Sequence, residues 1–279
     1  LSLRRQRQMC IRDSLWFVLG MGWGIEGSAI GTLICQIAMA VALVWVLWRR
    51  THGLDLSLVP HWGGIASSLR DGIPLLIRTL ALRAALYVTT WVAARAGAIT
   101  MAAYQVTMTI WNLLLMTMDA LGIAGQALTG ASLGAGDIRR TRLLTGTMTR
   151  WGVWAGVVIG ALLAASHQLV PAIYTNDPAV HRAVAAGLLV VAVEQVIAGP
   201  AFILDGVLIG AGDGRWLSRA QVVMFLVYLP MAWAVHLWAP ADPAAAVVWL
   251  WIAFGGFMAV RCGILAWRAH GDAWMRTGA

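Results

Sequence analysis

Charged residues are scarce in this chain, at 11% of its 279 residues against 60% hydrophobic residues. A soluble protein carries about a quarter charged residues, so the deficit argues against a soluble globular domain. Lysine is absent, and all twenty basic residues are arginine. The three cysteines form no CxxC or other zinc-type spacing, so no metal site is predicted. What remains is a chain with a mean hydropathy of +0.76, which is typical of an integral membrane protein.

Apolar runs of membrane-spanning length recur along the chain. A hydrocarbon core of about 30 Å demands roughly 20 helical residues at about 1.5 Å rise each, whereas barrel strands are half as long and alternate. We therefore predict an all-α integral membrane fold, a polytopic helix bundle of about seven transmembrane helices. The expected spans are residues 25–48, 73–95, 99–133, 146–169, 182–208, 217–238 and 244–267.

The first fourteen residues do not follow this pattern. Arg4–Ser14 resembles the translation of a transposase adapter used in sequencing libraries, so residues 1–14 are interpreted as an adapter-derived or non-native arm. A genuine basic arm before a membrane span is the alternative. Without the arm the formal charge falls from +8 to +5, which weakens the case for a nucleic-acid partner, and none is expected.

The longest connection between spans, residues 49–72, is the best boundary between two bundles. Its end, His61–Asp71, is expected to form a short interfacial helix before Pro74. The connection separates one helix hairpin from six following spans. The chain therefore looks like the tail of one bundle followed by a complete second bundle.

Arginines divide unequally between the two ends of the spans. When alternate connections are taken to face the same side, twelve arginines fall in one set and two, Arg95 and Arg182, in the other. The positive-inside rule then predicts that the two GAGD turns, residues 134–137 and 210–213, and the tail, residues 271–279, are cytoplasmic. The larger set is Arg49, Arg50, Arg70, Arg139, Arg140, Arg142, Arg150, Arg215, Arg219, Arg261, Arg268 and Arg276.

A single carboxylate, Asp119, interrupts the span 99–133. It precedes Gly134 by fifteen residues, or roughly 22 Å of helix, so it is expected deep in the bilayer, where an unpaired charge costs about 3 kcal/mol. Arg78 and Arg83 in the preceding span are its expected charge partners. Two interpretations stay open: a proton- or cation-responsive carboxylate near a cavity, or a structural ion pair that locks two helices.

A second pair of polar residues, Glu194 and Gln195, lies in the middle of the span 182–208, with Pro200 six residues after Glu194. Proline frees backbone carbonyls, and together with a buried acid it is a common way of lining a cavity. Asp205 lies only five residues before Gly210. Gating or loop anchoring is therefore expected of Asp205 rather than deep cation binding.

The helix that carries Asp119 also carries amphipathic and polarizable side chains. Gln105, Asn112 and Met116 recur at helical spacing and, with Tyr104, predict a cavity-facing stripe that accepts flat lipophilic cations. Ordinary helix packing is the alternative for each of them. No HExxH, Walker or GxSxG motif is present, so no catalytic residue is predicted.

At this point the chain resembles a known family. Residues 119–128, DALGIAGQAL, continuing to LGAGD, look like the DinF-like branch of the multidrug and toxic compound extrusion (MATE) family. IPLLIRT at 73–79, AARAG at 93–97 and DGVLIGAGD at 205–213 are similar to further family landmarks, in the family's order. The similarity covers residues 15–270. It implies a twelve-helix exporter of two six-helix lobes around a central cavity.

On that resemblance, residues 15–48 are the last helices of the N-lobe, 49–72 a cytoplasmic inter-lobe linker and 73–270 the complete C-lobe. The family's main proton site lies in N-lobe helices that would precede this sequence. The fragment is therefore not expected to transport without the missing N-lobe as its partner.

The resemblance further implies cation-coupled antiport rather than an enzyme, with no cofactor beyond the coupling ion. H⁺ is favoured over Na⁺, because the acidic position of sodium-coupled relatives falls closest to Ala198 here. The expected substrates are organic cations, drugs or other xenobiotics, and the expected location is a bacterial plasma membrane with its lipid. A lipid-linked precursor flippase of the same superfamily and an intramembrane enzyme are the alternatives.

Overall fold

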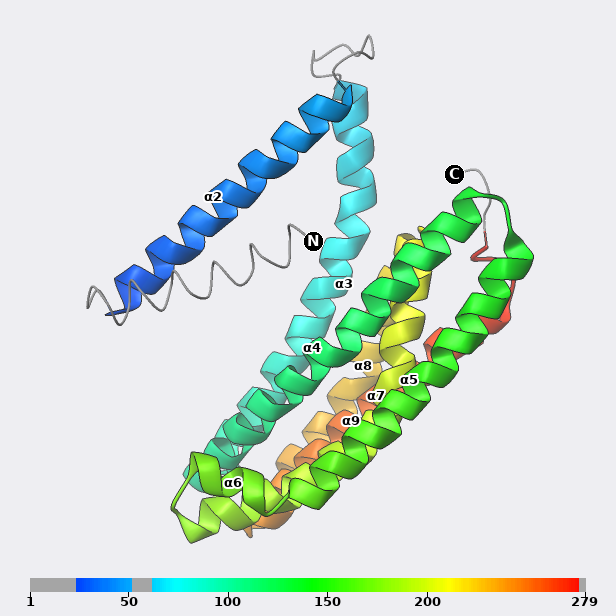
Figure 1. Ribbon diagram of the computed structural model, residues 1–279. Coiled ribbons are helices and arrows are strands. Elements are labelled where there is room, and N and C mark those ends of the chain that lie inside the picture. Colours follow the sequence, from blue (N-terminus) through cyan, green and yellow to red (C-terminus); the bar gives the residue numbers. More distant parts are fainter. Residues whose placement is uncertain (1–23, 52–61, 276–279) are drawn as a thin grey trace. The chain divides into compact units, whose positions relative to one another are not determined.

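The computed structural model describes residues 24–51 and 62–275, and all regular structure in these two ranges is helical (Figure 1). The chain divides into two compact units, Leu1–His61 and Trp62–Ala279. The predicted arm at 1–14, the centre of the predicted linker and the end of the predicted tail lie outside the described residues.

The described part of the first unit is a single helix, α2 (Gly24–Thr51). It contains an apolar span at Ala29–Arg49, which agrees with the predicted span 25–48. Glu26 lies in its first turn, where a negative charge complements the helix dipole.

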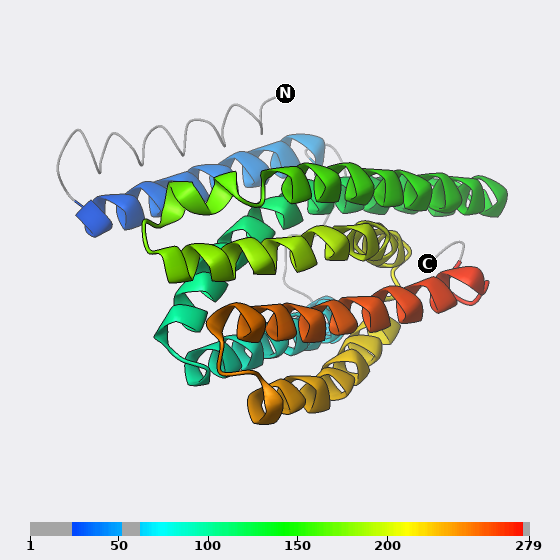
Figure 2. The same cartoon turned by 90° about the horizontal axis from the view of Figure 1, so that it is seen from below.

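Six long helices make up the second unit, where they lie side by side (Figures 1 and 2). With α2 they give seven described helices that are long and apolar enough to cross a membrane, as the sequence predicted. A short helix, α6 (Leu169–Tyr174), joins two of them. The long helices are α3 (Trp62–Arg95), α4 (Ala98–Gly134), α5 (Ile138–Ser166), α7 (Pro178–Gly210), α8 (Gly214–Trp238) and α9 (Pro243–His270).

Several helices extend beyond the predicted spans. The interfacial helix expected before Pro74 is wrong as a separate element, because α3 runs without a break from Trp62 through Pro74. α5 begins at Ile138 rather than residue 146, since Asp137 caps it by accepting the Arg140 N–H at 2.8 Å. Hydropathy marks only the apolar part of a helix, whereas capping decides where the helix begins.

The two GAGD sequences fold into the same turn. Gly136 and Gly212 both have φ of +75°, a conformation that glycine adopts without steric cost. The Asp137 N–H donates to the Ser132 carbonyl at 3.0 Å, and the Asp213 N–H donates to the Leu208 carbonyl at 3.1 Å. Each turn therefore closes one long helix and starts the next.

Helix α7 is the centre of the second unit. Of its most apolar stretch 72% is buried, against 22–44% for the other spans of this unit, and it packs chiefly on α4, α5 and α9. Helix α8 lies on α3 and α9. A charged side chain on the inner faces of α7 is therefore stabilised only where another helix supplies the opposite charge.

Glycines allow the close approach of α7 to its neighbours. A Cβ on Gly152 would lie 2.9 Å from the Gly199 carbonyl oxygen, and a Cβ on Gly156 would collide with the Gln195 carbonyl oxygen. The α4 side is equally close, because a Cβ on Gly206 would collide with the Gly122 carbonyl oxygen. Small residues four apart permit such backbone contact in membranes.

We predict that Gly156→Ala destabilises the protein, because the added methyl group meets backbone that cannot move aside. The expected cost is about 1–3 kcal/mol, or several degrees in the melting temperature measured in detergent. Gly146→Ala on the same helix is the matched control, since nothing lies within 4 Å of its Cβ position. Equal melting temperatures for the two variants would contradict the close α5–α7 contact.

Candidate functional site

A buried ionic cluster joins three helices of the second unit. The Asp205 carboxylate on α7 accepts from the guanidinium of Arg78 on α3, and it also accepts from Arg261 on α9 at 3.1 Å. The side chains of Asp205 and Arg261 are only 9% and 2% exposed. We call Arg78, Asp205 and Arg261 the ionic cluster. It holds two positive charges and one negative charge away from water.

Asp119 lies at the edge of the ionic cluster and is exposed in the described unit. It is within electrostatic range of both Arg78 and Arg261. The direct ion pair expected between Asp119 and Arg78 is not formed among the described residues, because the Arg78 guanidinium binds Asp205 instead. Asp119 therefore places a second acidic group near Arg78 and Arg261, but it forms no direct ion pair with either of them among the described residues.

Two expectations about arginines need correction. Arg83, proposed as a partner of Asp119, is exposed on α3 and forms no ion pair within the described residues. Arg261, counted with the cytoplasmic connections, is buried inside α9. Without Arg261 the count is eleven arginines against two, so the positive-inside bias remains. An arginine inside the predicted span 244–267 was the signal that could have identified it.

Asp205 was expected to gate or to anchor a loop. Its partners are helical residues that lie 127 and 56 positions away in the sequence. The carboxylate therefore ties α3, α7 and α9 together, and no loop residue is among these partners.

Glu194 occupies the centre of α7, sixteen residues from each end of the helix. It is 2% exposed, and neither carboxylate oxygen is hydrogen-bonded to a described residue. The Trp111 indole on α4 lies near enough to stabilise the ionised carboxylate, without the distance and angle of a full hydrogen bond, and the hydroxyl of Tyr228 on α8 is a further neighbour. A buried acid without a partner is costly in a membrane protein and usually functional.

Aromatic rings from three helices surround this part of α7. Trp111 packs edge-on against Phe254 with centroids 5.2 Å apart, and Tyr228 packs edge-on against the same ring at 6.3 Å. The Tyr228 hydroxyl lies 2.5 Å from that of Thr89 on α3, so it is already hydrogen-bonded. Tyr228 and Phe254 could not be singled out from the sequence, since aromatic residues are common in apolar spans.

Glu194 and Asp205 lie on nearly the same face of α7. They are eleven residues apart, which is about three helical turns and roughly 17 Å of rise. One carboxylate is held by two arginines, and the other has only aromatic and hydroxyl neighbours. The same face of one helix thus carries a neutralised acid and an unpaired acid.

The side chain of Gln195 points away from that of Glu194, although the two residues are adjacent in the sequence. It is buried, its amide donates to the Val191 carbonyl at 3.4 Å, and its Cβ lies beside Gly160 of α5. Adjacent positions on a helix point about 100° apart, so Gln195 packs in the α5–α7 contact while Glu194 faces elsewhere.

The predicted stripe on α4 is present as an exposed face. Gln105, Asn112, Met116 and Asp119 are all exposed, and Asn112 donates only to the Met108 carbonyl of its own helix, at 2.9 Å. Tyr104 is not part of this face. It is 2% exposed, accepts from Thr90 at 3.4 Å and packs against Trp251.

No group of three or more His, Cys, Asp or Glu side chains that could hold a metal ion occurs in the described ranges. Seven described helices that are long and apolar enough to cross a membrane, with buried charges on α7 and a polar face on α4, define a polytopic membrane protein.

The profile of the MatE family matches residues 74–234, more than half of the chain. The chain belongs to this family, the MATE transporters, whose members are not enzymes. The match begins in α3 and ends in α8, so it includes Arg78, Asp119, Glu194 and Asp205.

Two named relatives show how much of a transporter the chain represents. Protein DETOXIFICATION 45, chloroplastic, of Arabidopsis thaliana is 30% identical over 88% of the chain and 42% of its own length. A probable multidrug resistance protein NorM of Xanthomonas campestris is 28% identical over 73% of the chain and 44% of its own length. The chain therefore spans about half the length of the curated relatives it matches.

Solved structures agree with the fold. A transporter of the MOP superfamily from Pyrococcus furiosus superposes with a TM-score of 0.81 at 17% identity, over 95% of this chain and 60% of that one. The bent form of the Vibrio cholerae MATE transporter VcmN gives 0.73 at 17% identity, over 96% and 62%. At this identity the likeness concerns the fold alone.

We predict that Asp205→Asn strongly destabilises the protein. The substitution removes the carboxylate that binds both Arg78 and Arg261, and breaking such a buried pair costs about 3–5 kcal/mol. The check is the melting temperature in detergent. Asp272→Asn is the matched control, because Asp272 pairs with Arg142 where both side chains are more than half exposed, and exposed pairs contribute little. Equal losses in both variants would contradict the structural role of the ionic cluster.

Proposed function

We propose that this chain forms the C-lobe of a secondary active antiporter that exports organic cations, drugs or other xenobiotics in exchange for H⁺. The N-lobe of the same transporter completes the central cavity. The DinF-like landmarks at 119–137 and 205–213 favour that branch of the family. The protein requires no cofactor beyond its coupling ion.

The observation that carries the proposal is the unpaired Glu194 carboxylate at the centre of α7. A buried ionised carboxylate with no partner is unfavourable, so the site is stable when a proton or a cation occupies it. An acid that alternates between occupied and empty states is the element that a coupled transporter needs.

The neighbours of Glu194 favour H⁺ over Na⁺. Hard cations take several oxygen ligands, whereas the groups near Glu194 are the indole of Trp111 and a Tyr228 hydroxyl that is engaged with Thr89. A proton needs no further ligand. Pro200, two turns further along α7, removes one backbone donor from the helix and gives this segment a point at which it can bend.

The exposed face of α4 supports a cationic substrate. Polar and acidic side chains within a membrane span face a cavity or a bundle interior, and this face carries Asp119 together with Gln105, Asn112 and Met116. Met116 is 72% exposed, and its thioether adapts to flat ligands. We assign these side chains to the wall of the substrate cavity.

The charges argue against a lipid-linked precursor flippase, which needs a cationic cavity to hold phosphates. Arg78 and Arg261 are both bound to Asp205, and the charged group exposed beside them is an acid. For the Pyrococcus furiosus relative, a reversed polarity of the binding pocket suggests a different function. The sign of the charge that lines the cavity is therefore the property that distinguishes an exporter of cations from a lipid-linked precursor flippase.

We further propose that the protein lies in the plasma membrane with both GAGD turns and the C-terminus in the cytoplasm. The arginine bias of eleven to two supports this orientation. The buried position of Arg261 does not change it.

The decisive experiment measures efflux by the complete protein in cells that lack their own drug pumps, with Glu194→Gln against wild type. Gln keeps the shape and loses the ability to exchange a proton, so efflux driven by a pH gradient is expected to fall to the level of cells without the transporter. Asp177→Asn is the control, since Asn also caps a helix and Asp177 caps α7.

Proteoliposomes separate the coupling ions. An imposed pH gradient is expected to drive uptake of a fluorescent cation, and a sodium gradient of equal size is not. Full activity of Glu194→Gln would contradict coupling through Glu194, and activity driven by sodium alone would contradict coupling to H⁺.

We predict that Asp119→Asn weakens the apparent affinity for a divalent organic cation more than for a neutral lipophilic drug, because the exposed carboxylate is the charge that such a substrate meets. Concentration-dependent efflux of the two substrates is the measurement, with Asp242→Asn, a helix cap of α9, as control. Equal affinity for both substrates in Asp119→Asn and wild type would place Asp119 among the structural charges.

A further inference from the structure

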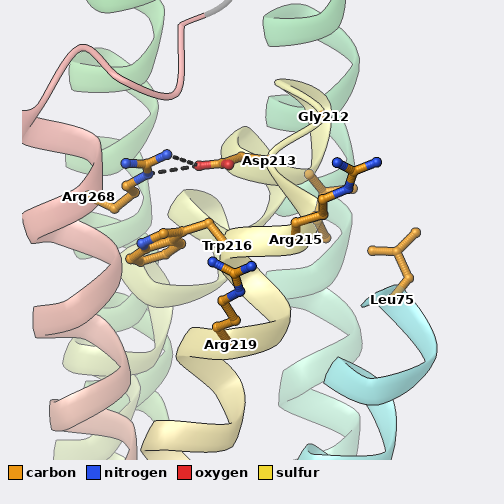
Figure 3. A pocket seen from close by; sticks show the side chains of 9 residues that line it. Leu75, Gly212, Asp213, Arg215, Trp216, Arg219 and Arg268 are labelled. Carbon is orange, nitrogen blue, oxygen red and sulfur yellow. Dashed lines mark hydrogen bonds and ion pairs between the residues drawn. The ribbon is translucent and has the colours of Figure 1, made fainter. Parts of the chain in front are cut away.

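Polar contacts join helix α8 to other helices at two levels. Where α8 begins, one carboxylate oxygen of Asp213 accepts from both Nε and Nη2 of Arg268 on α9, each at 2.8 Å (Figure 3). Fifteen residues further along the chain, the Tyr228 hydroxyl lies 2.5 Å from the Thr89 hydroxyl of α3. The second contact is the one beside Glu194, since Tyr228 lies within electrostatic range of that carboxylate.

The hydrogen atoms of the contact between Tyr228 and Thr89 can be assigned from their partners. A threonine hydroxyl has one hydrogen, and Thr89 donates it to the Ala85 carbonyl of its own helix at 2.8 Å. The Tyr228 hydroxyl is therefore the donor to Thr89, and the Tyr228 oxygen remains an acceptor. Both side chains are at most 2% exposed, so bulk water does not compete for these bonds.

Glu194 needs different partners in its two protonation states. Protonated, it is a donor, and the Tyr228 oxygen is an acceptor for it. Ionised, it only accepts, and neither of its oxygens has a hydrogen-bond donor among the described residues. Trp111 and Tyr228 pack against the same ring, that of Phe254, with centroids at 5.2 and 6.3 Å. The one hydrogen that Tyr228 can offer is the hydrogen that it gives to Thr89.

Among the described residues, few other titratable groups face this stretch of α7. Tyr104 of α4 lies within electrostatic range of Tyr228. Helix α5 presents Gly156 and Gly160 to α7, and α9 contributes the ring of Phe254. The charges of the ionic cluster lie about three turns further along α7. An ionised Glu194 therefore depends on hydroxyl and indole hydrogens and not on an arginine.

We propose that Tyr228 is a hydrogen-bond switch between Thr89 and Glu194. While Glu194 carries a proton, Tyr228 donates to Thr89 and joins α8 to α3. When Glu194 has released its proton to water, the Tyr228 hydroxyl hydrogen turns about the C–O bond and donates to the carboxylate, so α3 loses this bond. A charge-assisted hydrogen bond is roughly twice as strong as a neutral one, which favours the exchange. The inference rests on the proton exchange at Glu194 proposed above.

Infrared difference spectroscopy of the complete transporter, recorded over a series of pH values, tests the switch. The carboxylic acid C=O band that is missing in Glu194→Gln belongs to Glu194, and its loss with rising pH gives the midpoint of proton release. Tyr228→Phe removes the donor of the ionised form, so the midpoint is expected to rise by about one pH unit. Thr89→Val removes the competing acceptor and leaves Tyr228 to the carboxylate, so the midpoint is expected to fall.

The opposite signs separate the switch from a structural role. Both substitutions break the same hydrogen bond between Tyr228 and Thr89, so a structural role predicts shifts in the same direction or none. Tyr104→Phe is the matched control, because it removes a buried tyrosine hydroxyl whose partner is Thr90 at 3.4 Å, and it is expected to titrate as wild type does. Thr89→Ser keeps the hydroxyl and is expected to restore the wild-type midpoint.

Shifts of Tyr228→Phe and Thr89→Val in the same direction, or wild-type midpoints in both, would overturn the switch. If Tyr228→Phe does not fold, the sign of the shift in Thr89→Val against Thr89→Ser still decides. These results leave coupling through Glu194 in place when Glu194→Gln has lost its efflux. A Glu194 band that does not titrate, or full efflux by Glu194→Gln, would instead contradict the proton exchange itself and the switch with it.

Discussion

The ion pairs that Asp205 forms with Arg78 and Arg261 set the arrangement of the second unit. Helix α7 is buried on most of its surface, and a charge on such a helix is tolerated only when another helix supplies the opposite charge. Arg78 comes from α3 and Arg261 from α9, so one carboxylate holds three helices in register. Glu194, three turns away on the same face, has no such charge partner among the described residues.

The remaining faces of α7 make the opposite kind of contact. Gly199 meets Gly152 of α5, and Gly206 meets Gly122 of α4, with backbone against backbone. Such contacts leave no room for water or for a moving ligand. Close packing on two sides and buried charge on a third give the faces of α7 different characters: Gln195 packs in the α5 contact, whereas Asp205 binds arginines of α3 and α9.

Much of this architecture could be predicted from the sequence. The spans were visible because hydropathy over twenty residues depends on composition alone, and Asp119 and Glu194 stood out because acids are rare in such runs. The partner of Arg78 could not be predicted, because Asp119 and Asp205 were both available and only helix packing chooses between them. In the structure Arg78 binds Asp205, which lies 127 positions away in the sequence. Arg261 was misassigned to a connection, since a count of arginines near span ends does not measure depth.

By itself, the sequence determined that this chain has about seven runs long and apolar enough to cross a membrane and that it resembles the MATE family, because both depend on composition and on local motifs. The tertiary structure decided which charges meet, that Gln195 packs against α5 while Glu194 is unpaired, and that the two identical GAGD turns differ. Asp137 caps its own helix, whereas Asp213 binds Arg268 of α9. The reason is physical: a motif specifies its own turn, but a side chain takes whichever partner the neighbouring helices bring within reach.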